Sequence, residues 1–187
     1  MAADATPPMQ HRRILLCVCG GIAAYKAVEL VRRLRDAGAD VQVAMTADAL
    51  HFVGAPSFQA VSGRSVRSTL WDEAAEAAMG HIELARWAEQ VVIAPATANT
   101  LAKLAHGLAD DLVSTLCLAT TAPIAIAPAM NHRMWAHPAT QANVAVLRQR
   151  GVRVIGPDDG PQACGEFGPG RLREPDDIVA ALLEPVA

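Results

Sequence analysis

Five short stretches of the chain are apolar at almost every position and end in small or polar residues. They are RILLCVC (13–19), VQVAMT (41–46), VVIAPAT (91–97), PIAIAPAM (123–130) and VRVIGP (152–157). Strands with one face in water alternate apolar and polar residues, whereas strands covered on both faces are apolar throughout. We therefore predict five buried strands.

Helical patterns lie between these stretches and alternate with the predicted strands. They are AAYKAVELVRRLRDAG (23–38), which Gly38 ends, and then 81–90, 98–107, 110–120, 138–150 and 175–183. Such alternation is typical of an α/β fold, in which helices cover both faces of a parallel sheet. We predict this architecture.

The length and composition fit one domain with a sizeable core. The chain has 187 residues, of which 52 % are hydrophobic and only 4 % aromatic, which indicates an interior rich in Ala, Val and Leu. We expect residues 1–12 to form a disordered tail and residues 13–187 to form the single domain. The acidic stretch DEAAEA (72–77) is expected to be a solvated face.

Charge and hydropathy argue against two classes of partner. The net charge is −3 and the basic residues are scattered along helices, so we expect no nucleic acid partner. The N-terminus lacks the apolar core of a signal peptide, and no apolar run approaches the roughly 20 residues that cross a bilayer. We therefore expect a cytoplasmic protein without membrane contact.

The four cysteines are Cys17, Cys19, Cys117 and Cys164. Their spacing matches neither a disulfide framework nor a zinc site. We expect no bound metal, and free thiols are consistent with a reducing compartment.

The unusual chemistry of the sequence follows the strands. The segments CGGIAAYK, MTADALHF, APATANT, PAMNHRMW and PQACGEFGPGR come after the first to fifth strands in that order. Because parallel strands end at one edge of the sheet, these segments should meet there, where open α/β sheets bind ligands. An α/β domain without chemistry would leave this clustering unexplained.

Each of these segments also has an ordinary structural interpretation. Gly20 and Gly21 could face an anion at a helix N-terminus or only form a tight turn. The small residues of APATANT would let a planar ligand approach, with Thr97, Asn99 and Thr100 as donors, or these residues could only cap a helix.

The candidates for catalysis leave similar alternatives. His81 could be an exposed or capping residue. Asn131 could orient a carboxylate or be a helix N-cap. Cys164 stands in a glycine-rich loop that we expect to be mobile, as a proton donor or nucleophile, although a buried apolar role is open. We interpret His51, His106, His132 and His137 as surface or packing residues.

Four of these motifs carry a resemblance to a known family. PAMNHRMW resembles a signature of the flavin-dependent cysteine decarboxylases, and HIELARWA, APATANT and ACGEFGPGR resemble other signatures of that family. The motifs follow one another along this chain in the same order as in the family. The similarity extends from about Ile14 to Leu183. It implies a Rossmann-like or flavodoxin-like three-layer αβα sandwich that binds FMN. Within the family, the chain is most similar to the branch that acts in coenzyme A biosynthesis.

The resemblance implies which residues hold FMN. They lie in four turns and are Gly20, Gly21 and Ile22, then Thr46, Ala47 and Asp48, then Thr97, Ala98, Asn99 and Thr100, and finally Ala129. This agrees with the separate interpretation of these turns as anion and planar-ligand sites.

The resemblance also implies a reaction, the decarboxylation of 4'-phosphopantothenoylcysteine to 4'-phosphopantetheine. In this family FMN oxidises the CH2–SH group to a thioaldehyde, CO2 leaves to give an enethiolate, and the reduced flavin returns the hydride. His81 would act as base or orienting group, and Asn131 would hold the substrate carboxylate. Cys164 would protonate the enethiol, while Ala163 and Leu172 would line the substrate in a lid.

Leu172 is a departure, since many relatives have Met after Gly-Arg at this point; both residues are apolar and of similar volume. Relatives form homotrimers, and in bacteria dodecamers built from trimers, and bacterial relatives often continue into a synthetase domain that makes the substrate. Trp87, Met134 and Trp135 could lie at such an interface or in the core.

Other functions within the same fold are alternatives. A peptidyl-cysteine decarboxylase of the lantibiotic type lacks the reducing cysteine, so Cys164 disfavours it. A flavin prenyltransferase is not expected to combine His81, PAMNHRMW and the Cys164 segment. A non-catalytic flavoprotein that regulates a partner would be indicated by loss of His81, Asn131 or Cys164, and all three are present.

Overall fold

The computed structural model describes residues 8–71 and 80–184 and contains a five-stranded sheet. Its strands are β1 (Arg13–Val18), β2 (Asp40–Met45), β3 (Gln90–Ala96), β4 (Ile124–Pro128) and β5 (Arg153–Val154). All pair in parallel, in the order β2-β1-β3-β4-β5. The order reverses between β1 and β3, which is where flavodoxin-like sheets bind ligands.

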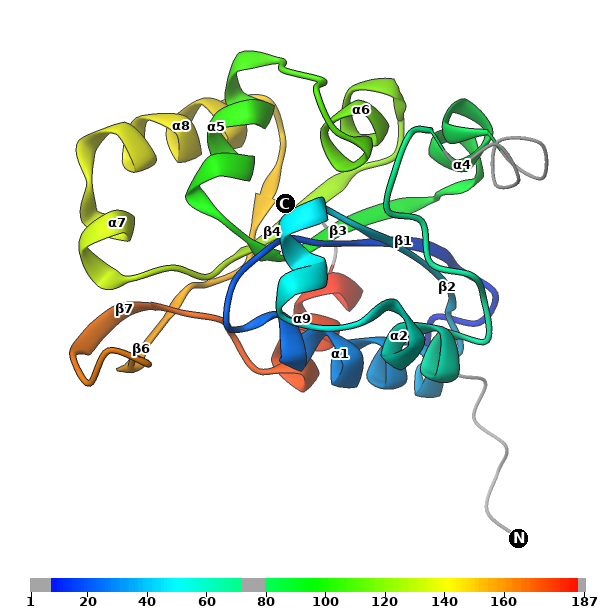
Figure 1. Ribbon diagram of the computed structural model, residues 1–187, viewed down its shortest axis with the longest axis horizontal. Coiled ribbons are helices and arrows are strands. Elements are labelled where there is room, and N and C mark those ends of the chain that lie inside the picture. Colours follow the sequence, from blue (N-terminus) through cyan, green and yellow to red (C-terminus); the bar gives the residue numbers. More distant parts are fainter. Residues whose placement is uncertain (1–7, 72–79, 185–187) are drawn as a thin grey trace, which may run out of the picture.

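Helices cover both faces of the sheet, as Figure 1 shows. One layer contains α1 (Ala24–Asp36), α2 (Ala55–Ser62) and α9 (Pro175–Leu183). The opposite layer contains α4 (His81–Trp87), α5 (Ala98–His106), α6 (Leu112–Ala119) and α8 (Pro138–Gln149). The predicted three-layer αβα fold is confirmed.

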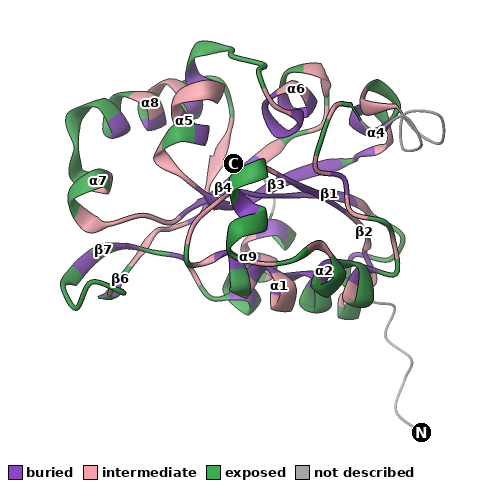
Figure 2. Cartoon of the chain, in the orientation of Figure 1, coloured by how far each residue is buried: buried purple, intermediate pink, exposed green. Residues whose placement is uncertain are grey.

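The core is divided by the sheet into two apolar clusters. In β1, Ile14 and Leu16 face the cluster that α1 and α9 cover, whereas Leu15 and Cys17 face the cluster under α5 and α6. Successive side chains of a strand point to opposite faces, so a strand that is apolar throughout contributes to both clusters. Figure 2 shows the strands as the buried centre of the molecule.

The structure contains short elements that the sequence did not predict. A helical turn, η1 (Ala47–His51), and α2 follow β2, and α7 (His132–Ala136) follows β4. These elements occupy segments interpreted only as ligand-binding turns or left unassigned. Among the described residues, no helix is long and apolar enough to cross a bilayer.

The segment around Cys164 is a loop, as expected, but it is bounded by two short strands that the sequence did not predict; its mobility stays a prediction. The two strands, β6 (Asp158–Pro161) and β7 (Phe167–Arg171), form an antiparallel hairpin. Gly165 adopts a positive φ of 83° in the connecting turn, a conformation that glycine adopts without strain. The hairpin extends from the sheet beside α7 (Figure 1).

Two glycines allow β7 to pack closely on the segment that follows β4. A Cβ atom on Gly168 would lie 3.0 Å from the Cβ of His132, and one on Gly170 would collide with the carbonyl oxygen of Met130. The amide of Met130 donates to the carbonyl of Gly170 at 2.9 Å. The hairpin is therefore joined to the segment that carries Asn131.

Residues 8–12, which were expected to belong to a disordered tail, include an ordered turn before β1. Met9 is buried in the core, and its amide donates to the carbonyl of Ala37 at 2.8 Å. Its apolar side chain explains the difference, because its burial stabilises an ordered turn before β1. Residues 1–7 and the predicted acidic face at 72–77 lie outside the described residues.

Candidate functional site

Backbone hydrogen bonds join the carboxyl ends of the strands into one edge, here called the carboxyl edge. The amide of Cys19 donates to the carbonyl of Pro95 at 3.3 Å, and that of Thr46 donates to Val18 at 3.0 Å. The amide of Ala129 donates to Ala96 at 3.0 Å. The turns after β1, β2, β3 and β4 are therefore neighbours.

The glycine turn after β1 has one crowded and one open position. A Cβ atom on Gly20 would overlap Asp48 of η1, whereas a Cβ atom on Gly21 would meet nothing within 4 Å. The N-cap of α1 is Ala23, whose methyl group cannot accept a hydrogen bond from the helix. Gly21 thus leaves space for a ligand at the positive end of a helix.

The turn after β3 presents hydroxyl groups at the start of α5. Thr97 is the N-cap, and its side chain accepts from the amide of Thr100 at 3.2 Å. The Thr100 hydroxyl donates to Sγ of Cys19 at 3.2 Å and lies 3.1 Å from the Thr97 hydroxyl. Burial raises the pKa of Cys19 to about 12, despite the opposing hydrogen bond from Thr100, so the acceptor is a neutral thiol.

The other predicted cofactor residues surround these two turns. Thr46 caps η1 by accepting from the amide of Ala49 at 3.3 Å, and Ala47 and Asp48 are exposed beside it. Ile22 is exposed, Ala98 and Ala129 are half-buried, and Asn99 is exposed on the first turn of α5. All eleven residues predicted to hold FMN therefore lie along the carboxyl edge.

A polar cluster forms where the β6–β7 hairpin meets α7. Nδ2 of Asn131 lies 3.6 Å from Sγ of Cys164, 3.2 Å from Oε1 of Gln162 and 3.4 Å from Oε2 of Glu166. Asn131 is also the N-cap of α7, since its Oδ1 accepts from the amide of Arg133 at 2.9 Å. The functional and the capping interpretations of Asn131 are thus compatible, because they use different atoms.

Sequence reasoning missed Gln162 and Glu166. Oε1 of Gln162 accepts from the amide of His132 at 3.0 Å, and Oε2 of Glu166 lies 3.5 Å from Sγ of Cys164. Hydrogen bonds from Cys164 and then from Asn131 lower the pKa of Glu166, so its carboxylate is ionised at neutral pH. The one signal in the sequence is the i, i+2 spacing of Cys164 and Glu166 around a glycine.

Ala163 and Leu172, predicted to line the substrate, occupy different environments. Ala163 is exposed near the hairpin turn, whereas Leu172 is only 3 % exposed and packs in the core at the end of β7. Leu172 therefore supports the base of the hairpin. That either residue contacts substrate stays a prediction.

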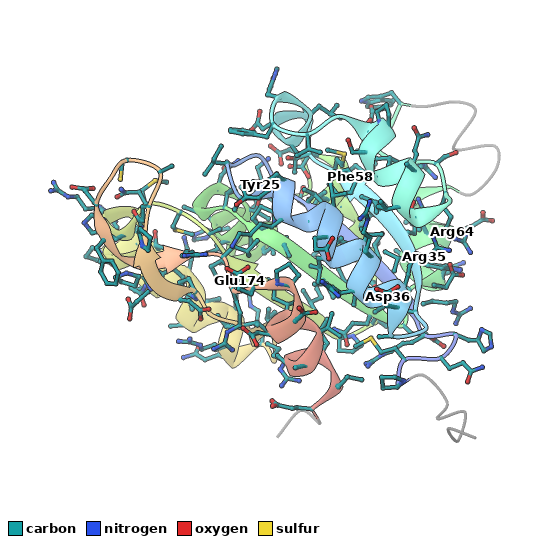
Figure 3. All side chains as sticks on the ribbon, turned by 90° about the horizontal axis from the view of Figure 1, so that it is seen from below. Tyr25, Arg35, Asp36, Phe58, Arg64 and Glu174 are labelled. Carbon is teal, nitrogen blue, oxygen red and sulfur yellow. The ribbon has the colours of Figure 1, made fainter. Side chains whose placement is uncertain are left out.

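An ion-pair network ties the base of the hairpin to α1. Lys26 Nζ lies 2.7 Å from Oε1 of Glu174, and an Nη of Arg171 lies 2.8 Å from the same oxygen. The hydrogen bond from Lys26 lowers the pKa of Glu174. Figure 3 shows Glu174 beside α1, whose first turn carries Tyr25. The hairpin and the helix of the glycine turn are thus held together.

His81 is not brought to this cluster within one chain. It is half-buried at the first position of α4, which lies at the opposite end of the molecule from α7 and the hairpin (Figure 1). On the same helix, Trp87 is half-buried under the guanidinium of Arg64, 5.3 Å from the ring centroid. Met134 is 50 % exposed and Trp135 half-buried.

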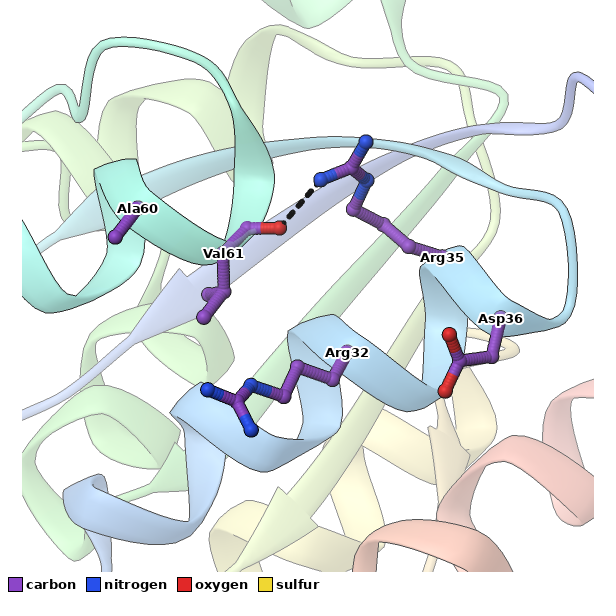
Figure 4. Close-up of a pocket in the computed structure, with 5 residues that line it drawn as sticks. All are labelled: Arg32, Arg35, Asp36, Ala60 and Val61. Atoms are coloured by element: carbon purple, nitrogen blue, oxygen red, sulfur yellow. Dashed lines mark hydrogen bonds between the residues drawn. The ribbon is translucent and has the colours of Figure 1, made fainter.

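A separate cavity of about 490 Å³ lies between α1 and α2 and is lined by Arg32, Arg35, Asp36, Ala60 and Val61 (Figure 4). Arg35 donates to the carbonyl of Val61 at 2.6 Å. Arg32, Arg35 and Asp36 lie near the C-terminal end of α1, whereas the glycine turn precedes its N-terminal end. The cavity is therefore not part of the carboxyl edge. Within the described ranges, no group of three or more His, Cys, Asp or Glu side chains could hold a metal ion.

Comparisons with known proteins show the family to which the chain is similar. The family model described as Flavoprotein matches residues 3–187. The coenzyme A biosynthesis bifunctional protein CoaBC of Escherichia coli (strain K12) is 60 % identical over 168 residues, which is 90 % of this chain and 41 % of that protein. CoaBC of Bacillus subtilis (strain 168) is 48 % identical over 171 residues, which is 91 % of this chain and 42 % of that protein. The chain thus spans about two fifths of the length of these curated relatives.

Two solved structures are similar to this chain over nearly their whole length. A PPC decarboxylase mutant complexed with pantothenoylaminoethenethiol has a TM-score of 0.82 and 34 % identity, with 92 % of this chain and 97 % of that chain covered. The FMN binding protein AtHal3 has a TM-score of 0.79 and 35 % identity, with 92 % and 95 % covered. The chain therefore belongs to the Flavoprotein family, as its motifs indicated.

Proposed function

We propose that this chain binds FMN and decarboxylates 4'-phosphopantothenoylcysteine to 4'-phosphopantetheine, a step of coenzyme A biosynthesis. The observation that carries the proposal is the pairing of an open carboxyl edge with the Asn131–Cys164 contact at its end. High identity to CoaBC and the likeness to a PPC decarboxylase bound to an enethiol support this substrate.

The residues of the carboxyl edge fit FMN. The open position at Gly21 and the N-terminus of α1 suit an anion, and the small residues Ala98 and Ala129 let a planar ring approach the backbone. Thr97 and Asn99 supply polar groups at the start of α5. When bound, FMN supplies reversible two-electron oxidation of the cysteine CH2–SH group, without which loss of CO2 would leave electrons with no acceptor.

Asn131 is suited to hold the substrate carboxylate. Its Nδ2 group points to the cluster while its Oδ1 is fixed by the amide of Arg133 at 2.9 Å, so the amide is oriented before substrate binds. A neutral donor positions a carboxylate without the strong ground-state stabilisation that a cation would give. Ala163 is exposed in the same turn as Cys164, and Leu172 packs in the core, where it supports the hairpin.

Cys164 is suited to donate a proton late in the reaction. Its thiol is exposed on the hairpin, 3.6 Å from the amide nitrogen of Asn131, and so lies where the substrate carboxylate end would be held. A proton donor at that point converts the enethiolate left after CO2 loss into a form that accepts a hydride.

The position of His81 supports a site completed by a second copy of the chain. If His81 acts in decarboxylation, α4 of one subunit must approach the α7 and hairpin region of another, because one chain separates them (Figure 1). A homotrimer, or a dodecamer built from trimers, meets this requirement. The exposed Met134 is available for such an interface.

The relatives extend well beyond the matched segment, so a synthetase part, fused or separate, is a further proposed partner that would supply the substrate. Free thiols at all four cysteines are consistent with a cytoplasmic location.

Substrate choice tests the proposal. The FMN-loaded protein is incubated anaerobically with either 4'-phosphopantothenoylcysteine or a peptide that ends in cysteine, and CO2 release is measured. We expect release from the first substrate only, and we expect Asn131→Ala to abolish it. Release from the peptide alone would replace this proposal with a peptidyl-cysteine decarboxylase.

A further inference from the structure

The environment of Cys164 contains a carboxylate, that of Glu166. Oε2 of Glu166 lies 3.5 Å from Sγ of Cys164, and Oε1 of Gln162 lies at 4.0 Å. Asn131 approaches the same sulfur as a donor, with Nδ2 at 3.6 Å. The thiol therefore lies between an amide donor and a carboxylate acceptor, and the carboxylate is the nearer of its two acceptors.

Glu166 is itself held by groups of α7. Its Oε1 lies 3.4 Å from a guanidinium nitrogen of Arg133, and its Oε2 lies 3.5 Å from Nδ1 of His132 and 3.4 Å from Nδ2 of Asn131. The other arginines of this region turn to different carboxylates, Arg171 to Glu174 and Arg173 to Asp158. Among the residues that the structure describes, the charged and titratable groups that face Glu166 and Cys164 are thus His132 and Arg133.

The hairpin turn places both side chains on one side. Gly165 separates them and has a φ of 83°, which bends the chain so that residues 164 and 166 face α7 together. The amide of Gly165 also donates to the carbonyl of Gln162 at 2.9 Å. The geometry of the turn therefore sets the contact between the side chains of Cys164 and Glu166.

We propose that Glu166 is a positioning residue: its carboxylate accepts from the Cys164 thiol and so fixes the sulfur beside Asn131, where the enethiolate would be bound, until the S–H group turns about the Cβ–Sγ bond towards the enethiolate carbon. This inference rests on the proposed function. In the step concerned, the S–H bond of Cys164 breaks and its proton goes to the enethiolate carbon. The electron pair of the C=C bond forms the new C–H bond, and water reprotonates the sulfur. Glu166 keeps its charge throughout.

The substitution Glu166→Gln tests this role with a matched control. Gln preserves size and removes the charge, and Asp159→Asn removes an exposed carboxylate on β6 of the same hairpin. We expect Glu166→Gln to release CO2 at the wild-type rate but to lower the ratio of phosphopantetheine to enethiol about tenfold or more, the loss expected for one hydrogen bond to a charged group. Glu166→Asp should restore part of the ratio, and Asp159→Asn should match wild type.

A second readout does not depend on activity. Cys17, Cys19 and Cys117 are buried and Cys164 is exposed, so iodoacetamide reports on Cys164 in the folded, FMN-loaded protein. The hydrogen bond to the Glu166 carboxylate holds the thiol in place, so Glu166→Gln, which weakens this bond, should be alkylated several-fold faster than wild type and Asp159→Asn.

The two readouts separate the possible failures. If wild type forms no enethiol and no phosphopantetheine, the proposed function fails, and the alkylation rates alone decide whether Glu166 controls the thiol. Equal alkylation rates and equal product ratios in wild type, Glu166→Gln and Glu166→Asp would overturn the positioning role. If Glu166→Gln does not fold, Glu166→Asp decides by the same two measurements.

Discussion

The hydroxyl group of Thr100 donates to the sulfur of Cys19 at 3.2 Å, and this contact ties the end of β1 to the first turn of α5. Both residues are buried, and both adjoin turns that we assign to FMN. The shape of the proposed cofactor site therefore depends on a contact in the core beneath it.

Replacing Cys19 with Ala should lower stability and weaken cofactor binding together. The buried Thr100 hydroxyl would lose this acceptor and keep only the Thr97 hydroxyl at 3.1 Å, and the net loss of one hydrogen bond typically costs about 1 kcal/mol. Cys19→Ser preserves an acceptor and serves as the control. Urea denaturation and FMN titration measure the two effects; wild-type affinity in Cys19→Ala would show that this contact does not support the site.

Adjacent glycines should respond differently to substitution with Ala. Gly20→Ala places a methyl group into Asp48, and overpacking of this kind costs about 1–3 kcal/mol of unfolding free energy. Gly21→Ala meets no neighbouring atom, so its stability should stay within about 0.5 kcal/mol of wild type while its FMN affinity falls. Unchanged FMN affinity in Gly21→Ala would remove Gly21 from the cofactor site.

The start of α6 should make stability depend on pH. Burial acts to raise the pKa of Asp111, but its ion pair with Lys103 and its hydrogen bonds from Ser114 lower it overall. A carboxyl group with a lowered pKa stabilises the fold above its ordinary pKa, and this stabilisation is lost as the pH falls through the lowered value.

Asp111→Ala removes the cap and should cost about 1 kcal/mol or somewhat more at neutral pH. Asp111→Asn retains a capping oxygen without the charge, so its loss should be smaller. Urea denaturation at a series of pH values should show the difference between wild type and Asp111→Ala shrinking towards acid. A difference independent of pH would contradict the role given to the carboxylate.

Two inactive variants should complement each other if the site lies between subunits. His81→Asn lacks a group on α4, and Cys164→Ser lacks the thiol of the hairpin, so neither should form phosphopantetheine alone. Co-expressed in one cell, they should form mixed oligomers in which some sites carry both native groups. Recovery of phosphopantetheine formation measures this; absence of recovery in demonstrably mixed oligomers would place His81 outside the shared site.

The long elements were predictable because their patterns are strong. RILLCV is apolar at all positions after its first residue, and in the fold it is covered on both faces. The helix from Ala24 to Asp36 has its buried residues on one face and ends before Gly38. Such patterns identify the elements, and the rule for parallel strands then places the glycine and threonine turns at one edge.

The short elements were not predictable for physical reasons. FGPGR has buried positions that are glycines, so the alternation of β7 carries no hydrophobic signal, and its close packing on Met130 appears only in three dimensions. The role of Glu166 depends on the same turn. The separation of His81 from Asn131 depends on the strand order, which the motifs do not encode.

Mass spectrometry of the products tests the central claim most directly. The purified, FMN-loaded chain is incubated anaerobically with 4'-phosphopantothenoylcysteine. The account predicts 4'-phosphopantetheine as the product, which requires both loss of CO2 and return of the hydride. Recovery of unchanged substrate, with FMN demonstrably bound, would contradict the account and favour a non-catalytic flavoprotein.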